Sequence, residues 1–160
     1  MPPPWASSAA SGPDVPPEMR DKAAGFLILR AFFAQFWLLQ CFGKLYDQES
    51  GVAAWRNLAI WSRHTTEWFV KQTVLPGWLV HPYTAVLPYA ELTLGLCFLL
   101  GFQTRRTILA AAALLISLDA GLLLQLKHDV VAMNTVYLLA LLLALRWEPQ
   151  QRWSIDSWWR

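Results

Sequence analysis

A single carboxylate lies inside an apolar stretch that is about long enough to cross a bilayer. The stretch runs from Pro82 to Arg106, and Glu91 is its one acidic residue. A carboxylate in hydrocarbon is energetically costly unless it is paired, protonated or facing a cavity. Another part of the chain must therefore face Glu91, and its partner is the main guide to function.

Two further ionisable residues, Arg30 and Asp119, fall within apolar runs. At about 1.5 Å per residue of helix, Arg30 lies within about one turn of the depth of Glu91. A guanidinium fork on a carboxylate is a strong pair, so we predict an Arg30–Glu91 ion pair inside the membrane. For Asp119 two interpretations stay open: the acid is protonated, or it meets Lys44 or His81 from the outer mouth of the helices.

Ionisable residues at such depths are typical of proton relays and of sites for membrane-soluble redox carriers. Arg30, Glu91 and Asp119 are therefore a candidate quinone or proton site, with Lys44 and His81 as candidates at its outer mouth. The alternative is that Asp119 is a packed, hydrogen-bonded acid with a structural role. The three histidines have no ligand-motif spacing, and we expect no metal site.

The composition indicates a membrane protein rather than a soluble one. Of the 160 residues, 56% are hydrophobic and only 15% are charged. The ten tryptophans agree with this, because Trp concentrates where hydrocarbon meets lipid headgroups. The net charge of +2 is too small to argue for a nucleic-acid partner.

The hydrophobic pattern predicts an all-α membrane protein with a four-helix transmembrane bundle. The expected spans are residues 23–46, 82–102, 107–126 and 130–146. The first run could also be read as a signal peptide, but it is too long and no cleavage pattern follows it. Between the first two spans, residues 52–73 carry tryptophans and other residues of one helical face at three- and four-residue steps, with the charged residues largely away from that face. This predicts an extra amphipathic helix in the first outer loop, lying on the membrane surface or covering the mouth of the bundle.

The chain divides into a tail and one membrane domain. Residues 1–21 contain six prolines and are expected to be disordered or bound to a partner. Residues 22–160 form the transmembrane domain. Basic residues near the span ends favour a location in the bacterial inner membrane with both termini in the cytoplasm.

Four segments resemble the DoxX/DoxD-like integral membrane proteins. The most specific is residues 88–105, which begin Pro-Tyr-Ala-Glu and end Leu-Gly-Phe-Gln-Thr-Arg. Leu29-Arg30 and Gly43-Lys44 are similar to parts of that family's first helix, and residues 152–156, Arg-Trp-Ser-Ile-Asp, are similar to its closing motif. The resemblance implies a four-helix bundle and, in one branch, the membrane subunit of a quinone-linked sulfur oxidoreductase beside a second subunit.

The sequence therefore leaves several functions open. One is a membrane subunit of a quinone-linked oxidoreductase or electron-transfer complex, with a quinone as candidate cofactor. The alternative is a non-catalytic structural subunit at the periphery of a larger respiratory or photosynthetic membrane complex. A small transporter or assembly factor is a third, but no pair of broken helices points to a water-filled path. In each case the expected partners are the lipid bilayer and other membrane protein subunits.

Overall fold

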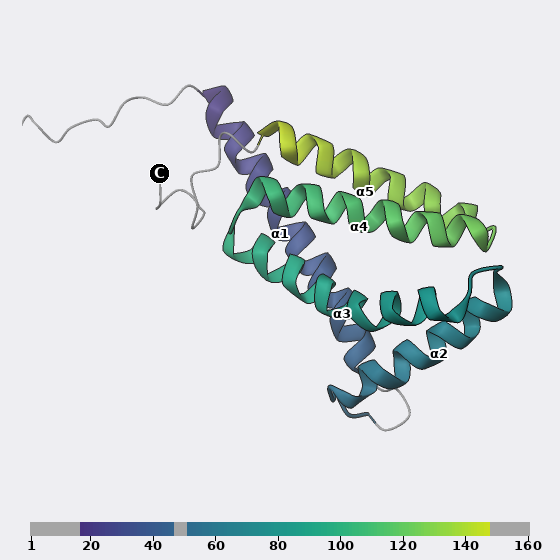
Figure 1. Ribbon diagram of the computed structural model, residues 1–160. Coiled ribbons are helices and arrows are strands. Elements are labelled where there is room, and N and C mark those ends of the chain that lie inside the picture. The colour runs from purple at the N-terminus through teal and green to yellow at the C-terminus, as the bar shows by residue number, and fades with distance from the viewer. Residues whose placement is uncertain (1–16, 47–50, 148–160) are drawn as a thin grey trace, which may run out of the picture.

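The computed structural model describes residues 17–46 and 51–147. The described chain is helical, with an isolated β-bridge between Tyr46 and Ala53 and no strand in these two ranges. The five helices are α1 (Pro17–Leu45), α2 (Arg56–Gln72), α3 (Gly77–Leu100), α4 (Thr104–Leu124) and α5 (His128–Trp147). Figure 1 shows α4 and α5 side by side, with α1 crossing α3.

Four of these helices are long and apolar enough to cross a membrane. The qualifying segments are Asp21–Leu45, Gly77–Leu100, Thr104–Leu124 and His128–Trp147. At most 39% of the most apolar window of each segment is buried, and for α5 only 11% is. Exposed apolar side chains on spanning helices are the surface that hydrocarbon covers. The expectation of an all-α protein with four apolar helices is therefore confirmed.

All four apolar helices begin earlier than the sequence indicated, and the difference is largest for α1 and α3. α1 begins at Pro17, a residue favoured at the first position of a helix, so residues 17–21 are helical rather than part of the tail. The rest of the expected tail, residues 1–16, lies outside the described residues. α3 begins at Gly77 instead of at Pro82, which lies inside the helix.

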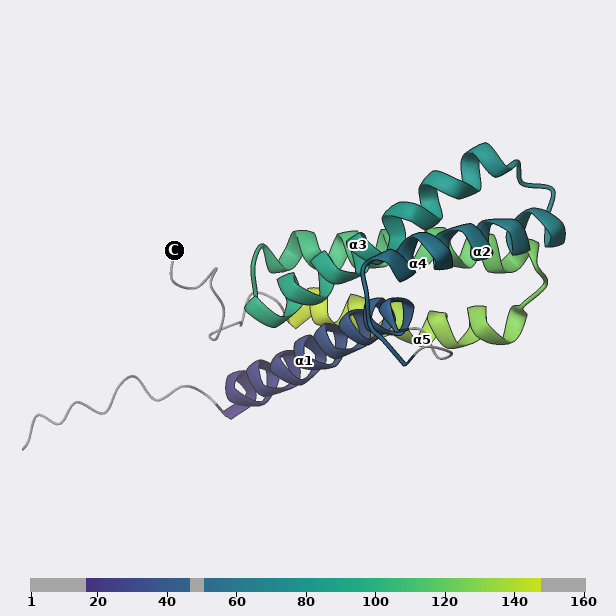
Figure 2. The same ribbon diagram turned by 90° about the horizontal axis from the view of Figure 1, so that it is seen from below.

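The two prolines inside α3 have a structural consequence. Pro82 and Pro88 each lack a backbone N–H, so each leaves one carbonyl of the preceding turn without its helical partner. Proline is the usual cause of a bend in a helix, and Figure 1 shows α3 bent part-way along its length. The first half of α3 thereby turns away from α4 and packs along α2, as Figures 1 and 2 both show.

Aromatic side chains and one glycine set the contact between α1 and α3. Phe33 and Phe98 stack with ring centroids 5.6 Å apart. A Cβ atom on Gly95 would lie only 2.7 Å from Cγ of Leu38, so the glycine allows the two helices to approach closely. The helices run antiparallel with Phe33 beside Phe98 and Leu38 beside Gly95. This register continues toward the C-terminal end of α1, where the site described below lies.

A hydroxyl cluster fastens α2 to α3. The hydroxyl of Thr84 lies 2.9 Å from the hydroxyls of both Ser62 and Thr66. At the start of α2, the Asn57 side-chain amide donates to the carbonyl of Leu45 at 2.8 Å, which satisfies a carbonyl at the end of α1. The helix α2 lies within the expected interval of residues 52–73. Its location, on the membrane surface or over the mouth of the bundle, stays a prediction.

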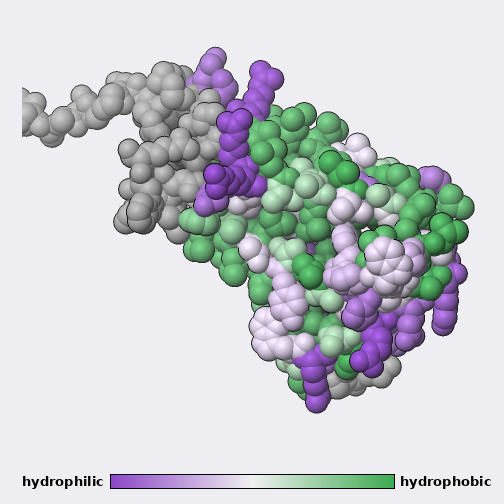
Figure 3. All heavy atoms as spheres, viewed as in Figure 1, coloured by the Kyte–Doolittle hydropathy of each residue, from purple (hydrophilic) through white to green (hydrophobic). Residues whose placement is uncertain are grey.

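Hydrophobic and hydrophilic residues cover different parts of the surface along the length of the helices. Hydrophobic residues cover the middle of the helices, with hydrophilic side chains near the start of α1 and around α2 (Figure 3). The ring of Trp147, at the end of α5, packs beside Gly25 near the start of α1. Both ends of the described chain therefore lie at one end of the bundle (Figure 1).

Candidate functional site

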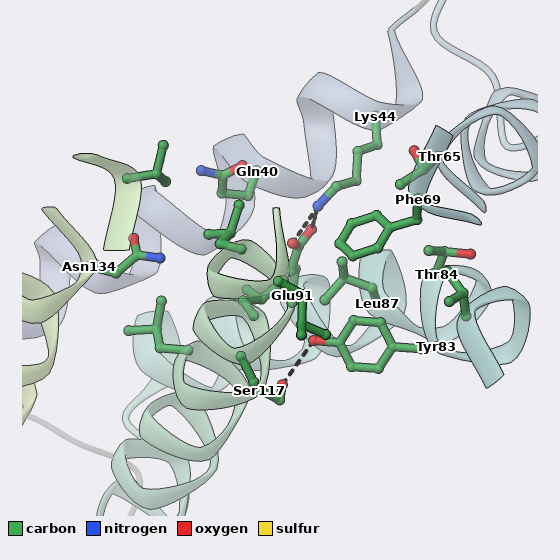
Figure 4. A pocket seen from close by; sticks show the side chains of 18 of the residues that line it. Gln40, Lys44, Thr65, Phe69, Tyr83, Thr84, Leu87, Glu91, Ser117 and Asn134 are labelled. Atoms are coloured by element: carbon green, nitrogen blue, oxygen red, sulfur yellow. Dashed lines mark hydrogen bonds and ion pairs between the residues drawn. The ribbon is translucent and has the colours of Figure 1, made fainter. Parts of the chain in front are cut away.

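A buried ion pair joins α1 to α3. The ammonium group of Lys44, in the last turn of α1, donates hydrogen bonds to both carboxylate oxygens of Glu91, which lies near the middle of α3 (Figure 4). The side chains are 11% and 3% exposed. Charge-assisted hydrogen bonds of this kind are the strong ones, and a cation in the last turn of a helix also complements the helix dipole.

A third helix contributes to the same cation. The ammonium group of Lys44 lies 4.8 Å from the centroid of the Trp61 ring on α2. A cation over an indole face is attracted by the electron-rich ring. Lys44 therefore contacts α2 and α3 at once, and its charge is compensated by a carboxylate on one side and an aromatic face on another.

The predicted ion pair between Arg30 and Glu91 is wrong, because Lys44 binds the Glu91 carboxylate. Arg30 precedes Lys44 by 14 residues along α1, which is about 21 Å of helix. The prediction placed Arg30 within about one turn of the depth of Glu91, which assumed that the two spans were level. In the structure α3 is shifted along α1, so that the middle of α3 lies beside the C-terminal end of α1.

Asp119 has an amide partner. The side-chain amide of Asn134, on α5, donates to the Asp119 carboxyl at 2.6 Å. This interhelical hydrogen bond joins α4 to α5. The two partners proposed for Asp119 lie elsewhere. Lys44 is ion-paired with Glu91, and His81 is an exposed residue near the start of α3.

A cavity of about 570 Å³ connects these features. Its walls come from all five helices: the end of α1, α2, the first half of α3, the end of α4 and the start of α5. Figure 4 shows the Lys44–Glu91 pair in its wall, between Phe69 of α2 on one side of the view and Asn134 of α5 on the other. Its polar or charged lining residues are Gln40, Lys44, Thr65, Tyr83, Thr84, Glu91, Ser117 and Asn134, and most of the remaining wall is aliphatic or aromatic.

The cavity brings together only part of the predicted cluster. Glu91 and Lys44 line it directly. Asp119 is buried and bonded to the lining residue Asn134, so it reaches the cavity through that amide. Arg30 and His81 are absent from the described lining.

Two lining residues were missed by sequence reasoning. The hydroxyl of Tyr83 on α3 lies 2.8 Å from that of Ser117 on α4 (Figure 4). Both residues are partly exposed, so this bond crosses the edge of the cavity. A tyrosine and a serine in apolar runs are common, so the sequence does not single them out. The path of α3 in the folded chain brings the two hydroxyls together.

The cavity can bind a ligand that is mostly apolar and accepts hydrogen bonds. Its volume is within the range of small-molecule sites, about 300–1,000 Å³. Among its described lining residues the formal charges are one ammonium and one carboxylate, which compensate each other. A neutral ring with carbonyl groups would find donors in Lys44, Tyr83 and Asn134 and flat contact surfaces in the aromatic walls.

Comparisons with protein-family models, with curated proteins and with solved structures find no match for this chain. The function is therefore argued from the residues and the geometry of this site.

Proposed function

We propose that this chain is a DoxX/DoxD-like integral membrane subunit of a quinone-linked oxidoreductase or electron-transfer complex. The observation that carries the proposal is the 570 Å³ apolar cavity with the buried Lys44–Glu91 pair in its wall. A quinone ring is flat and neutral and carries two carbonyl acceptors, which suits such a cavity. The family resemblance implies a second subunit beside the membrane subunit, and we propose that such a subunit supplies the electrons.

The Glu91 carboxyl group gives this cavity a means of handling protons. A quinone that takes up electrons also takes up protons, so a carboxyl group at the ring can hold a proton close to a carbonyl oxygen. Glu91 lines the cavity. Asp119 does not line it, but accepts a hydrogen bond from Asn134, which does. In this proposal Lys44 orients the ring, Glu91 exchanges the proton, and Asp119 holds the Asn134 amide in place.

Two further observations support the family and the location. The Pro-Tyr-Ala-Glu segment that resembles the family's second-helix signature places Glu91 at the cavity, and Gly95, one turn later, makes the close contact with α1. Both ends of the described bundle lie on one side. We accordingly propose the bacterial inner membrane with both termini in the cytoplasm, with α2 at the outer surface.

The test is quinone-dependent electron transfer by the complex purified in mild detergent. Neutralising Asp119 with Asp119→Asn and Glu91 with Glu91→Gln should each lower the rate, with protein amount and fold checked by gel filtration. Glu67→Gln is the matched control, because Glu67 is an exposed carboxylate on α2 outside the cavity wall. Unchanged rates in both cavity variants would count against the proposal.

The alternative is a non-catalytic structural subunit at the periphery of a larger respiratory or photosynthetic membrane complex. It is favoured by α5, whose large apolar side chains Val136, Leu139 and Leu142 are each at least 60% exposed on one face. This alternative predicts that the chain co-purifies with larger membrane partners, and that removing residues 1–20 breaks the association. A monodisperse chain that binds quinone alone would argue against it.

A further inference from the structure

A second hollow lies on the outer face of the bundle between α3 and α4. Its walls include Val86, Tyr89 and Thr93 of α3 and Ala110 and Ala113 of α4. The alanines form a low surface, and the larger side chains of α3 stand beside it. We call this hollow the α3–α4 groove.

The groove and the cavity meet at one residue. Ser117 lines both of them, and it is bonded to Tyr83, which lines the cavity. On α4, the cavity is lined by residues from Leu115 to Leu124, whereas the groove is lined by residues from Ala110 to Ser117. The Tyr83–Ser117 hydrogen bond thus stands at the point where the two hollows adjoin.

The groove runs along the helix axes, from the level of the cavity toward the middle of the helices. From Ser117 to Ala110 it follows α4 for seven residues, about 10 Å. This path passes the midpoint of α4, which lies at Leu114, whereas the cavity occupies the half of the bundle nearer α2. An amphiphile dissolved in a bilayer lies in the same sense, with its polar head toward one surface and its tail toward the midplane.

We propose that the α3–α4 groove holds the hydrocarbon tail of the quinone whose ring lies in the cavity, with the tail passing between α3 and α4 beside Tyr83 and Ser117. This inference rests on the proposed function, since it requires a ring in the cavity. The occupant is argued from the shared residue: because Ser117 borders both hollows, a tail attached to a ring at the cavity edge would pass beside Ser117 to reach the apolar groove.

The experiment uses a benzoquinone that carries a photoreactive diazirine near the end of a decyl tail. The full chain in lipid nanodiscs is irradiated with this probe, and the labelled peptides are mapped by mass spectrometry. We expect adducts on residues 86–94 and 110–117, and most of this yield should disappear when an excess of the same benzoquinone without a tail competes for the cavity.

Two variants localise the effect. Ala113→Phe fills the groove and should remove most of the adducts there, while leaving the binding of the tail-less quinone unchanged. Ala132→Phe places the same ring at an exposed alanine of α5 outside the walls of both hollows, and it should change neither.

The outcomes separate the two proposals. If the tail-less quinone does not bind to the wild-type chain, the proposed function fails, and the tail site fails with it. If it binds but the adducts lie on another face, or if groove adducts persist under competition, the tail site alone is overturned and the groove holds ordinary lipid chains. The same holds if Ala113→Phe leaves the adducts in place.

Discussion

Replacing Glu91 by glutamine should destabilise the fold strongly, because it leaves the ammonium group of Lys44 without its carboxylate. Removing one partner of a buried ion pair costs about 3–5 kcal/mol. Lys44 is 11% exposed and lines a cavity that water can enter, so we expect the lower end, about 3 kcal/mol. Lys44→Met should cost a similar amount, because it leaves the Glu91 carboxylate buried.

The double variant Lys44→Met/Glu91→Gln tests whether the losses belong to one interaction. It removes both charges, so neither is left uncompensated, and its loss should be well below the sum of the two single losses. Arg30→Met supplies the matched comparison. Arg30 lies about 21 Å from Lys44 along α1, so its effect should add to that of Glu91→Gln.

The assay is reversible unfolding in mixed micelles with increasing fractions of a denaturing detergent, followed by circular dichroism. Each variant gives a free energy of unfolding relative to wild type. The reasoning is refuted if Glu91→Gln unfolds like wild type, or if the losses from Lys44→Met and Glu91→Gln add in full. A strong coupling of Glu91 to Arg30 instead of Lys44 would restore the pairing that the sequence suggested.

Three further changes test other contacts with the same unfolding assay. Gly95→Ala should destabilise by about 1–3 kcal/mol because the new methyl group overlaps a leucine of α1, whereas Gly43→Ala, with nothing within 4 Å, should be neutral or slightly stabilising; equal effects would contradict the close packing. Asp119→Ala should cost about 0.6–1.7 kcal/mol by removing the acceptor for Asn134, and Asp119→Asn, which keeps an acceptor, should cost less. Tyr83→Phe should cost about 0.6 kcal/mol through loss of its bond to α4, and no loss would show that this bond does not hold the cavity edge.

The sequence predicts the class of fold because the evidence is local. Each span is a long apolar run, and length and composition decide whether a helix can cross a bilayer. The starts of the helices were less predictable. Pro82 is a reasonable first residue for a span by local preference, yet α3 begins at Gly77 and accepts the proline inside the helix.

The partner of Glu91 could not be predicted because it depends on how far one helix slides along another. A shift of α3 along α1 replaces Arg30 by Lys44, and this shift follows from long-range contacts such as Gly95 beside Leu38. The hydrogen bond from Asn134 was easier to foresee. An amide in an apolar helix needs a partner, although only the packing of α4 against α5 shows that the partner is Asp119.

The most direct test of the account is a titration of a tail-less benzoquinone into the purified chain, followed by quenching of tryptophan fluorescence. Trp37 and Trp61 line the cavity, so a ring bound there should quench them. The account predicts saturable quenching in the wild-type chain and its loss in folded Lys44→Met/Glu91→Gln protein. Quenching that does not saturate, or equal affinity in the double variant, would contradict a quinone site at the Lys44–Glu91 pair.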